Sequence, residues 1–420
     1  MTHSHSAAAT VEMILEFNRD RIPELVNRKY RRMSEDAFAF LRGTDHIFAH
    51  HWSRLGPQDP GPSILICGDL HLENFGAYRT DDGAVLYDIN DFDEALVAPC
   101  SLDLVRCTTS ILLAAQLWKL SPVQAMRMVL TFLDRYRATV TKSVRTGHVG
   151  EMALGTSRGP IWNLLQRPTK QGSARFLDRF TELTTEGVRR IVLRPKRFLK
   201  VSSDTRNQIT EALKAYSRSK PSPEAFEAID VAFRVAGTGS LGLKRYAVLV
   251  QGVGSPDGNW LLDIKQAQKS ALLGCSSTEI QLQDGGSGAR RAVMAERLLQ
   301  SRPTAKLDVI ELAGELYRMR ELIPEENRSG LDELREQPGK LRRAVAIAGR
   351  LVGWAHVRGS RVGEIDRSRD LSDWAKGPGL DAVIASAVRY AEVTRRERKA
   401  FVEAAPFKKK SGVEVKSASC

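Results

Sequence analysis

The sequence predicts an α+β fold in which a β-rich region lies between helical segments. The chain has 420 residues, of which 42% are hydrophobic and 27% charged, enough for two domains or one bilobed domain around a large buried core. Apolar residues recur at helical spacing towards both ends of the chain. Between them, from about residue 231 onwards, short apolar runs alternate with glycine and proline turns, as in antiparallel strands.

The charge is the most unusual feature of the composition. Lys and Arg number 63 against 50 Asp and Glu, which gives a net charge of +13. Such an excess attracts nucleic acid, nucleotides or acidic membrane surfaces without choosing among them. The basic clusters at residues 29–33, 189–200 and 408–410 are typical of solvated faces or tails, and we interpret them so.

The same composition argues against several protein classes. No apolar run approaches the roughly 18–20 residues that a membrane span needs, and the first residues lack the pattern of a secretory signal, so we expect a cytoplasmic protein. The five cysteines contain no CxxC pair. We therefore expect neither a disulfide framework nor a zinc site.

The first half of the chain predicts helices around one set of short strands. Residues 1–60 carry helical spacing, and SILICGDL, residues 63–70, has the pattern of a buried strand. The segment 77–90 predicts a hairpin, because Asp82-Gly83 separates two apolar runs. Helices are expected to dominate residues 102–216, one of them starting at Ser121-Pro122.

The second half predicts the β-rich region and a helical end. Three strands are expected within residues 231–268, then a helix at 290–300, strands within 307–323, and helices at 341–357 and 380–404. The predicted organisation is a helical segment at 1–60, catalytic and metal loops with helices at 61–225, a β-rich part at 226–325, C-terminal helices at 326–405, and a flexible basic tail at 406–420.

The strongest local motif is GDLHLEN, residues 68–74, directly after the predicted strand. Asp69 and Asn74 lie five residues apart on a tight loop and can share one site. A carboxylate there can orient or deprotonate a hydroxyl group, and an amide oxygen can help to hold a hard cation. His71 belongs to the same loop, where a hydrogen-bonding role in the scaffold is expected.

An acidic cluster follows the hairpin at residues 88–94, DINDFDE. It holds four carboxylates in seven residues, and oxygen ligands of this kind favour magnesium or manganese over zinc. Asp88 and Asp91 are both candidates for the metal ligand. Because Asp91 begins the DFD triplet and lies 12 residues before Asp103, it is slightly preferred.

A glycine-rich segment, GTGSLG at residues 237–242, lies between two predicted strands. Its glycines let the backbone approach an anionic group, and a following strand argues against a Rossmann turn and for a hairpin over phosphates. Lys265 lies 23 residues after Gly242 in an apolar strand, where burial requires an anionic partner. A position on the solvent face of an edge strand is the alternative for this lysine.

These motifs together resemble two known groups of proteins. GDLHLEN followed by a hairpin and DFD is similar to the catalytic and metal-binding loops of the protein-kinase-like superfamily, particularly aminoglycoside and choline phosphotransferases. At closer range, FAFLRG, CGDLHLENFG, DINDFDEA, LDLVR, GTGSLG and GWAH resemble the bacterial domain-of-unknown-function 2252 family, from about Arg28 to Ala404. Cys67 stands where the phosphotransferases often carry a histidine, a position thought to be structural.

The kinase-like resemblance implies a role for each matching residue. Asp69 would be the catalytic aspartate, Asn74 and either Asp91 or Asp88 would bind magnesium, and Asp103 would steady the catalytic loop. The implied cofactors are ATP and Mg²⁺, or Mn²⁺. The nucleotide phosphates would be bound by the following set: Gly237, Gly239, Ser240, Gly242 and Lys265.

Other implied assignments leave alternatives open. The glutamate that holds Lys265 would be Glu296, with Glu279 as the alternative, and the adenine would lie against residues 317–324. Arg42 in FAFLRG has no counterpart in the superfamily pattern and would either contact a phosphate or brace the fold.

The order of the motifs is unusual for that superfamily. Kinases run from the glycine loop and lysine to the catalytic loop, whereas here the catalytic loop comes first. The GWAH segment, residues 353–356, resembles the end of the helix that normally precedes the catalytic loop. A kinase-like bilobed fold that is circularly permuted would produce this order.

The expected activity is an ATP- and magnesium-dependent transfer of phosphate to a small-molecule hydroxyl. A protein acceptor is less expected because no APE-like end of an activation segment follows DFD. Transfer of AMP is a related alternative. A nucleotide-binding pseudokinase or regulator, with nucleic acid as a less favoured partner, is the alternative outside enzymes.

Overall fold

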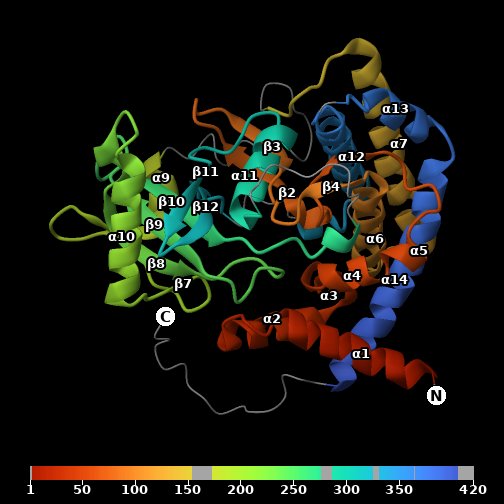
Figure 1. Ribbon diagram of the computed structural model, residues 1–420, viewed down its shortest axis with the longest axis horizontal. Coiled ribbons are helices and arrows are strands. Elements are labelled where there is room, and N and C mark those ends of the chain that lie inside the picture. The colour runs from red at the N-terminus through yellow and green to blue at the C-terminus, as the bar shows by residue number, and fades with distance from the viewer. Residues whose placement is uncertain (1, 154–172, 276–285, 325–330, 364, 405–420) are drawn as a thin grey trace.

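The computed structural model describes residues 2–153, 173–275, 286–324, 331–363 and 365–404. It has the mixed α+β architecture that the sequence predicts. A six-stranded sheet lies on one side of the molecule and most of the helices on the other, while α1 and α2 run below both parts (Figure 1). Within the described residues, no helix combines the length and the apolar composition that crossing a bilayer requires.

The larger part is helical. Its helices are α1 (Thr2–Phe17), α2 (Pro23–Glu35), α3 (Ala37–Gly43), α4 (Asp45–His50), α5 (Trp52–Leu55), α6 (Ser101–Leu117), α7 (Pro122–Thr146), α12 (Pro338–Gly359), α13 (Ser368–Lys376) and α14 (Gly379–Ala404). The predicted start of α7 is confirmed, since Ser121 and Gln124 form a reciprocal capping box before Pro122.

Helices α7 and α12 pack closely along their length. A Cβ atom on Gly349 would lie 2.2 Å from the carbonyl oxygen of Phe132, and one on Gly353 would lie 2.9 Å from the side chain of Thr139. Glycine therefore lets the two backbones approach, and side chains that flank the contact are brought to the same groove.

Two short pairs of antiparallel strands carry the loops of the helical part. Strand β1 (Ser63–Ile66) pairs antiparallel with β4 (Leu96–Pro99), and β2 (Phe75–Arg79) pairs with β3 (Val85–Ile89). The hairpin predicted at Asp82-Gly83 is confirmed, because Gly83 has a φ of 82° in the turn between β2 and β3.

The sheet has the strand order β11-β12-β10-β9-β8-β7, with every pairing antiparallel. Its strands are β7 (Phe198–Leu199), β8 (Ala228–Arg234), β9 (Arg245–Val250), β10 (Trp260–Gln266), β11 (Asp308–Leu312) and β12 (Glu315–Glu321). The strands expected within residues 231–268 and 307–323 are thereby confirmed, and β7 joins the sheet from outside the 226–325 region.

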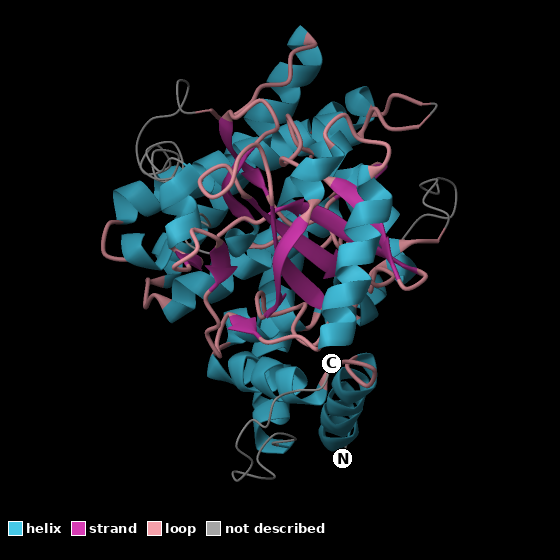
Figure 2. Ribbon diagram, turned by 90° about the vertical axis from the view of Figure 1, so that its left-hand side faces the viewer, coloured by secondary structure: helices cyan, strands magenta, loops and turns pink. Residues whose placement is uncertain are grey.

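Helices cover the faces of this sheet. Figure 2 shows a helix in front of the strands, and α10 (Ser203–Ser217) places Ile209 and Leu213 in one apolar cluster with β8, β9 and β10. On the opposite face a second cluster joins α9 (Ser173–Asp178) to Ala247 and Leu261. The helix predicted at 290–300 is confirmed as α11 (Gly288–Leu299).

The middle of the chain holds strands as well as the expected helices. Helices α6, α7, α9 and α10 take up most of the described residues of 102–216, but β5 (Thr181–Leu183) pairs with β6 (Arg189–Ile191) ahead of β7. The basic cluster at 189–200 is a solvated face for the most part, since Arg190, Arg194, Lys196 and Lys200 are exposed, but Arg189 is an exception. Arg189 is only 2% exposed and pairs with Asp178 and Asp257, each at 2.7 Å. The predicted tail at 406–420 lies outside the described residues.

Candidate active site

A cleft forms where the β1–β2 loop, the segment after β3 and the β8–β9 loop meet. The segments come from distant parts of the sequence, about 170 residues apart for Asp93 and Lys265. Predicted site residues that line it are Asp69, Asn74, Asp91, Gly237, Gly239, Ser240 and Lys265. The structure thus brings most of the predicted set into one place.

Asp69 lies in a turn that only glycine can precede. Gly68 has a φ of 91°, and a Cβ atom there would lie 2.2 Å from the carbonyl oxygen of Glu94. The turn is fixed from helix α6, because Asp103 accepts hydrogen bonds from the backbone N–H groups of Cys67 at 3.0 Å and Gly68 at 2.9 Å. Asp103 therefore steadies the loop, as its sequence context implied.

The same helix holds the side chain of Asp69. Arg106 follows Asp103 by one turn and donates from Nε to Asp69 Oδ1 at 2.5 Å, while its other end donates to the carbonyl of Leu41. Burial raises the pKa of Asp69 to about 6, although the charge of Arg106 acts in the opposite direction. Asp69 is thus ionised near neutral pH and still basic enough to accept a proton.

Asn74 lies beside Asp69 at the end of the same loop. The side-chain N–H of Asn74 donates to the backbone carbonyl of Asp69. The backbone carbonyl of Asn74 accepts from the backbone N–H of Asn90 at 2.7 Å. The second contact joins the GDLHLEN loop to the DFD segment. His71 is 5% exposed and accepts from the N–H of Glu73 at 3.2 Å, which is the scaffold role expected for it.

The structure separates the two candidate metal aspartates. Asp91 lines the cleft, whereas Asp88 is buried in β3 and accepts from the backbone of Ile89 at 2.9 Å and of Ser301 at 3.3 Å. The carboxylate of Asp88 is therefore engaged by backbone N–H groups and does not line the cleft. Asp93, which the sequence did not single out as a ligand, lines the cleft beside Asp91.

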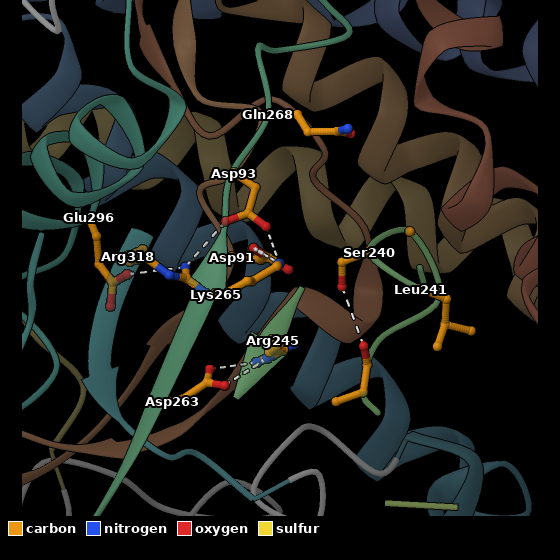
Figure 3. A network of polar contacts seen from close by, with 12 residues as sticks. Asp91, Asp93, Ser240, Leu241, Arg245, Asp263, Lys265, Gln268, Glu296 and Arg318 are labelled. Carbon is orange, nitrogen blue, oxygen red and sulfur yellow. Dashed lines mark hydrogen bonds and ion pairs between the residues drawn. The ribbon is translucent and has the colours of Figure 1, made fainter. Parts of the chain in front are cut away.

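Lys265 is buried and faces the acidic segment. Its ammonium group contacts Asp93 and lies 4.0 Å from Asp91, as Figure 3 shows. Burial lowers the pKa of Lys265, while the two aspartates act in the opposite direction. The lysine is 1% exposed, so the alternative of a solvent-facing edge position is wrong.

The expected contact between Lys265 and Glu296 does not form. Glu296 on α11 pairs with Arg320 at 2.9 Å and Arg318 at 3.6 Å, and Arg318 also lies 3.4 Å from Asp93. Strand register explains this, since Arg318 in β12 lies directly opposite Lys265 in β10 and comes between the lysine and the helix. The alternative, Glu279, lies outside the described residues.

The glycine loop joins β8 to β9. Gly237 and Gly242 have φ angles of 78° and 92°, which side chains rarely adopt, and Ser240 donates to the carbonyl of Ala236 at 3.3 Å. Gly242 does not line the cleft. It packs against Arg21, whose Cβ would lie 2.7 Å from a Cβ added at Gly242.

Three cations from the N-terminal segment hold this loop from behind. Arg32 donates to the carbonyl of Gly237 at 2.9 Å, and Lys29 and Arg21 both donate to the carbonyl of Gly239, at 3.0 and 2.5 Å. The prediction that residues 29–33 form a solvated face is therefore wrong. Lys29 is fully buried, and burial holds its pKa well below the usual range.

The spacing of residues in the sequence indicates the burial of Lys29, although its charge suggests exposure. Leu25, Lys29 and Met33 repeat at four-residue spacing, so the lysine lies on the apolar side of α2. Arg42 also lines the cleft, together with Arg21 and Lys265, and pairs with Glu73 at 2.7 Å.

The oxygen donors fit a hard divalent cation. Asn74, Asp91 and Asp93 supply amide and carboxylate oxygens to one cleft, the ligand type that magnesium prefers. In the part of the chain that the structure describes, no three His, Cys, Asp or Glu residues form a metal site by themselves.

The cleft is narrow as it stands. Its cavity volume is about 60 Å³, well below the roughly 300–1,000 Å³ that is typical of small-molecule sites. A nucleotide therefore requires the glycine loop or the Lys265–Asp93 contact to move. Residues 317–324 are the segment predicted to face adenine. Two of them, Leu322 and Pro324, line a smaller pocket of about 20 Å³ together with Ala236.

Comparison with known proteins identifies one family. The model of a family described as an uncharacterized protein conserved in bacteria (DUF2252) matches residues 21–404. The match covers both the cleft and the helices around it. No curated protein and no solved structure matches the chain.

Proposed function

The chain belongs to the bacterial DUF2252 family, and we propose that it is an ATP- and magnesium-dependent phosphotransferase acting on the hydroxyl group of a small molecule. The observation that carries the proposal is the convergence of Asp69, Asn74, Asp91 and Lys265 under the glycine loop. A base, oxygen ligands for a hard cation and a phosphate-binding lysine are the parts that phosphoryl transfer needs.

In this proposal each side chain has one task. Asp69, held by Arg106, accepts the proton of the attacking hydroxyl. Asn74 and Asp91 hold magnesium, which neutralises charge on the transferred phosphate. Lys265 and the N–H groups of residues 237–240 bind the phosphates, and Lys265 exchanges its contact with Asp93 for one with the nucleotide.

The arrangement of the chain supports a permuted kinase-like fold. Helix α12, which carries the GWAH segment, lies against β1, since a Cβ atom on Gly359 would lie 2.0 Å from the carbonyl oxygen of Leu65. His356 at its end lies 3.2 Å from Asp103. The helix thus reaches the catalytic loop in space although it follows that loop by almost 300 residues.

The test is a metabolite extract incubated with ATP labelled on the γ-phosphate. Wild type is expected to transfer label to at least one metabolite in the presence of magnesium, and Asp69→Asn is expected to reduce the rate at least about 10²-fold. Asp20→Asn, at an exposed residue without contacts to the cleft, is the matched control.

Two outcomes would contradict the proposal. Transfer that is unchanged in Asp69→Asn removes the catalytic assignment of that residue. Label transferred only from ATP labelled on the α-phosphate shows that AMP, and not phosphate, is the group transferred.

A further inference from the structure

A second, larger cavity lies between α7, α12 and residues 148–152. Its volume is about 810 Å³, within the range of roughly 300–1,000 Å³ that is typical of small-molecule pockets. No residue lines both this cavity and the cleft described above. It is therefore a separate feature of the molecule.

The cavity is lined by an excess of positive charge. Arg135 and Lys142 come from α7, and Arg350 and Arg358 come from α12. The single lining carboxylate, Glu151, pairs with Arg302 at 3.1 Å. Within the described ranges none of the four cations forms a close ion pair with a carboxylate, although Asp88 and Glu151 act on the charge of Arg358 from a greater distance.

Helix geometry explains why these cations face one another. Arg135 and Lys142 are seven residues apart on α7, and Arg350, Trp354 and Arg358 are four residues apart on α12, so each set forms a stripe on one side of its helix. Because glycines let the two helices pack closely, both stripes border the same groove.

The contacts of Arg350 make the charge excess costly. Burial and the neighbouring charge of Arg135 both lower the pKa of Arg350. Its only neighbouring favourable contact in the described part of the chain is with the ring of Trp354, at 5.9 Å from the guanidinium carbon to the ring centroid. Two arginines that repel each other without a carboxylate between them are stabilised by an anion.

An aromatic ring adjoins the cations. Trp354 lines the cavity, and Gly150 packs against its ring, since a Cβ atom on Gly150 would lie 2.6 Å from the indole. Donors and one flat apolar surface thus line the same cavity.

We propose that this cavity binds a small organic anion that carries two or more phosphate groups next to a flat ring. The phosphates contact Arg135, Lys142 and Arg350, which can bind them through bidentate and charge-assisted hydrogen bonds. The ring packs against Trp354. The concave shape favours a small molecule over the extended backbone of a nucleic acid, and the proposal stands independently of the phosphotransferase function.

The test is isothermal titration of the full chain with inorganic pyrophosphate at 0.15 M salt, a condition that screens diffuse surface charge over about 8 Å. Wild type is expected to bind in a saturable manner. The double variant Arg135→Ala/Arg350→Ala is expected to weaken the affinity at least tenfold. The control Arg342→Ala/Arg343→Ala removes the same charge from exposed positions of α12 that do not line the cavity, and is expected to change the affinity less than about twofold.

Further variants separate this site from the cleft. Lys265→Met is expected to leave pyrophosphate binding at the second cavity intact. If pyrophosphate binding is lost only in Lys265→Met, pyrophosphate binds in the cleft and the proposal is overturned. No binding by wild type, or equal weakening in both double variants, would also overturn it. If Arg135→Ala/Arg350→Ala does not fold, Arg135→Glu at the exposed α7 position decides in the same way.

A competition experiment addresses the nucleic-acid alternative. A random single-stranded RNA that displaces pyrophosphate and binds wild type more tightly, with both double variants equally weakened, would show a diffuse polyanion surface and overturn the proposal. If the Lys265→Met variant binds adenosine diphosphate more tightly than it binds pyrophosphate, the result would support the contact between a ligand ring and Trp354.

Discussion

At the scale of single residues, the cleft depends on what α6 supplies to one loop. Asp103 and Arg106 are one helical turn apart, and the first fixes the backbone of Gly68 while the second fixes the carboxylate of Asp69. Asp69 is therefore held by a fully buried arginine in a chosen orientation. A base that is positioned in advance loses little entropy when the acceptor arrives.

The raised pKa of Asp69 predicts the pH dependence of the reaction. Only the ionised carboxylate accepts a proton, and it is lost as the pH falls through about 6. We expect kcat/KM to fall about tenfold per pH unit below that value and to be level above it. Initial rates between pH 4.5 and 8 measure this; a profile that is flat down to pH 4.5 would contradict the role of Asp69.

The buried carboxylate of Asp103 predicts a large effect on stability. Asp103→Ala leaves two buried N–H groups without an acceptor and is expected to lower the free energy of unfolding by about 3–5 kcal/mol. Asp103→Asn keeps one acceptor oxygen and is expected to lose less. Urea unfolding of the two variants gives the comparison, and equal losses would show that the acceptor is not the cause.

At the scale of elements, helix α2 and the glycine loop behave as one unit. The carbonyls of Gly237 and Gly239 accept hydrogen bonds from Arg32, Lys29 and Arg21, which leaves the N–H groups of residues 237–240 for the cleft. Because the cavity is too small for a nucleotide, opening it requires the loop to move either with α2 or against these hydrogen bonds.

This contact predicts a variant that affects binding more than chemistry. Arg32→Ala removes one hydrogen bond to the loop and is expected to raise the KM for ATP about three- to tenfold with little change in kcat. Arg31→Ala, at the neighbouring exposed arginine, is the matched control. Equal effects of the two substitutions on KM would show that general charge, and not the loop contact, is responsible.

The elements also show what local sequence patterns can predict. The hairpin at Asp82-Gly83 and the start of α7 at Pro122 follow from turn and cap residues that act over a few positions, and both are confirmed. The Lys265–Asp93 contact and the insertion of Arg318 between Lys265 and Glu296 depend on strand register. Register is set by tertiary pairing, so the sequence alone could not place the partner of the lysine.

At the scale of the whole molecule, segments from opposite ends of the sequence lie side by side. Helix α12 packs against β1, which leads into the Asp69 loop, and α14 near the C-terminal end contacts α1 at the other end, where Thr10 donates to Glu397 at 3.3 Å. The described ends of the chain therefore lie on the same side of the molecule (Figure 1). This geometry allows the ends to be joined.

A permuted chain tests the proposed relationship to kinase-like proteins. The new chain starts at Ser173, continues to Ala404, is joined by a flexible linker to Thr2 and ends at Ala153, so that the glycine loop precedes the catalytic loop. It is expected to fold with a melting temperature within about 5–10 °C of wild type and to keep nucleotide binding, since the contacts among the residues that the structure describes are retained. Circular dichroism measures the first property. Failure to fold with linkers of several lengths would contradict it.

The contact between Asp103 and His356 has a consequence for folding during translation. Tyr136 and Asp103 contact the two ring nitrogens of His356, so the catalytic loop is fully braced only when α12 is present. The histidine follows Asp103 by 253 residues, which at about 5–20 residues per second corresponds to roughly 13–50 s of translation. During that interval the nascent chain carries the Asp69 loop without this contact, so the loop reaches its final geometry only when synthesis is nearly complete.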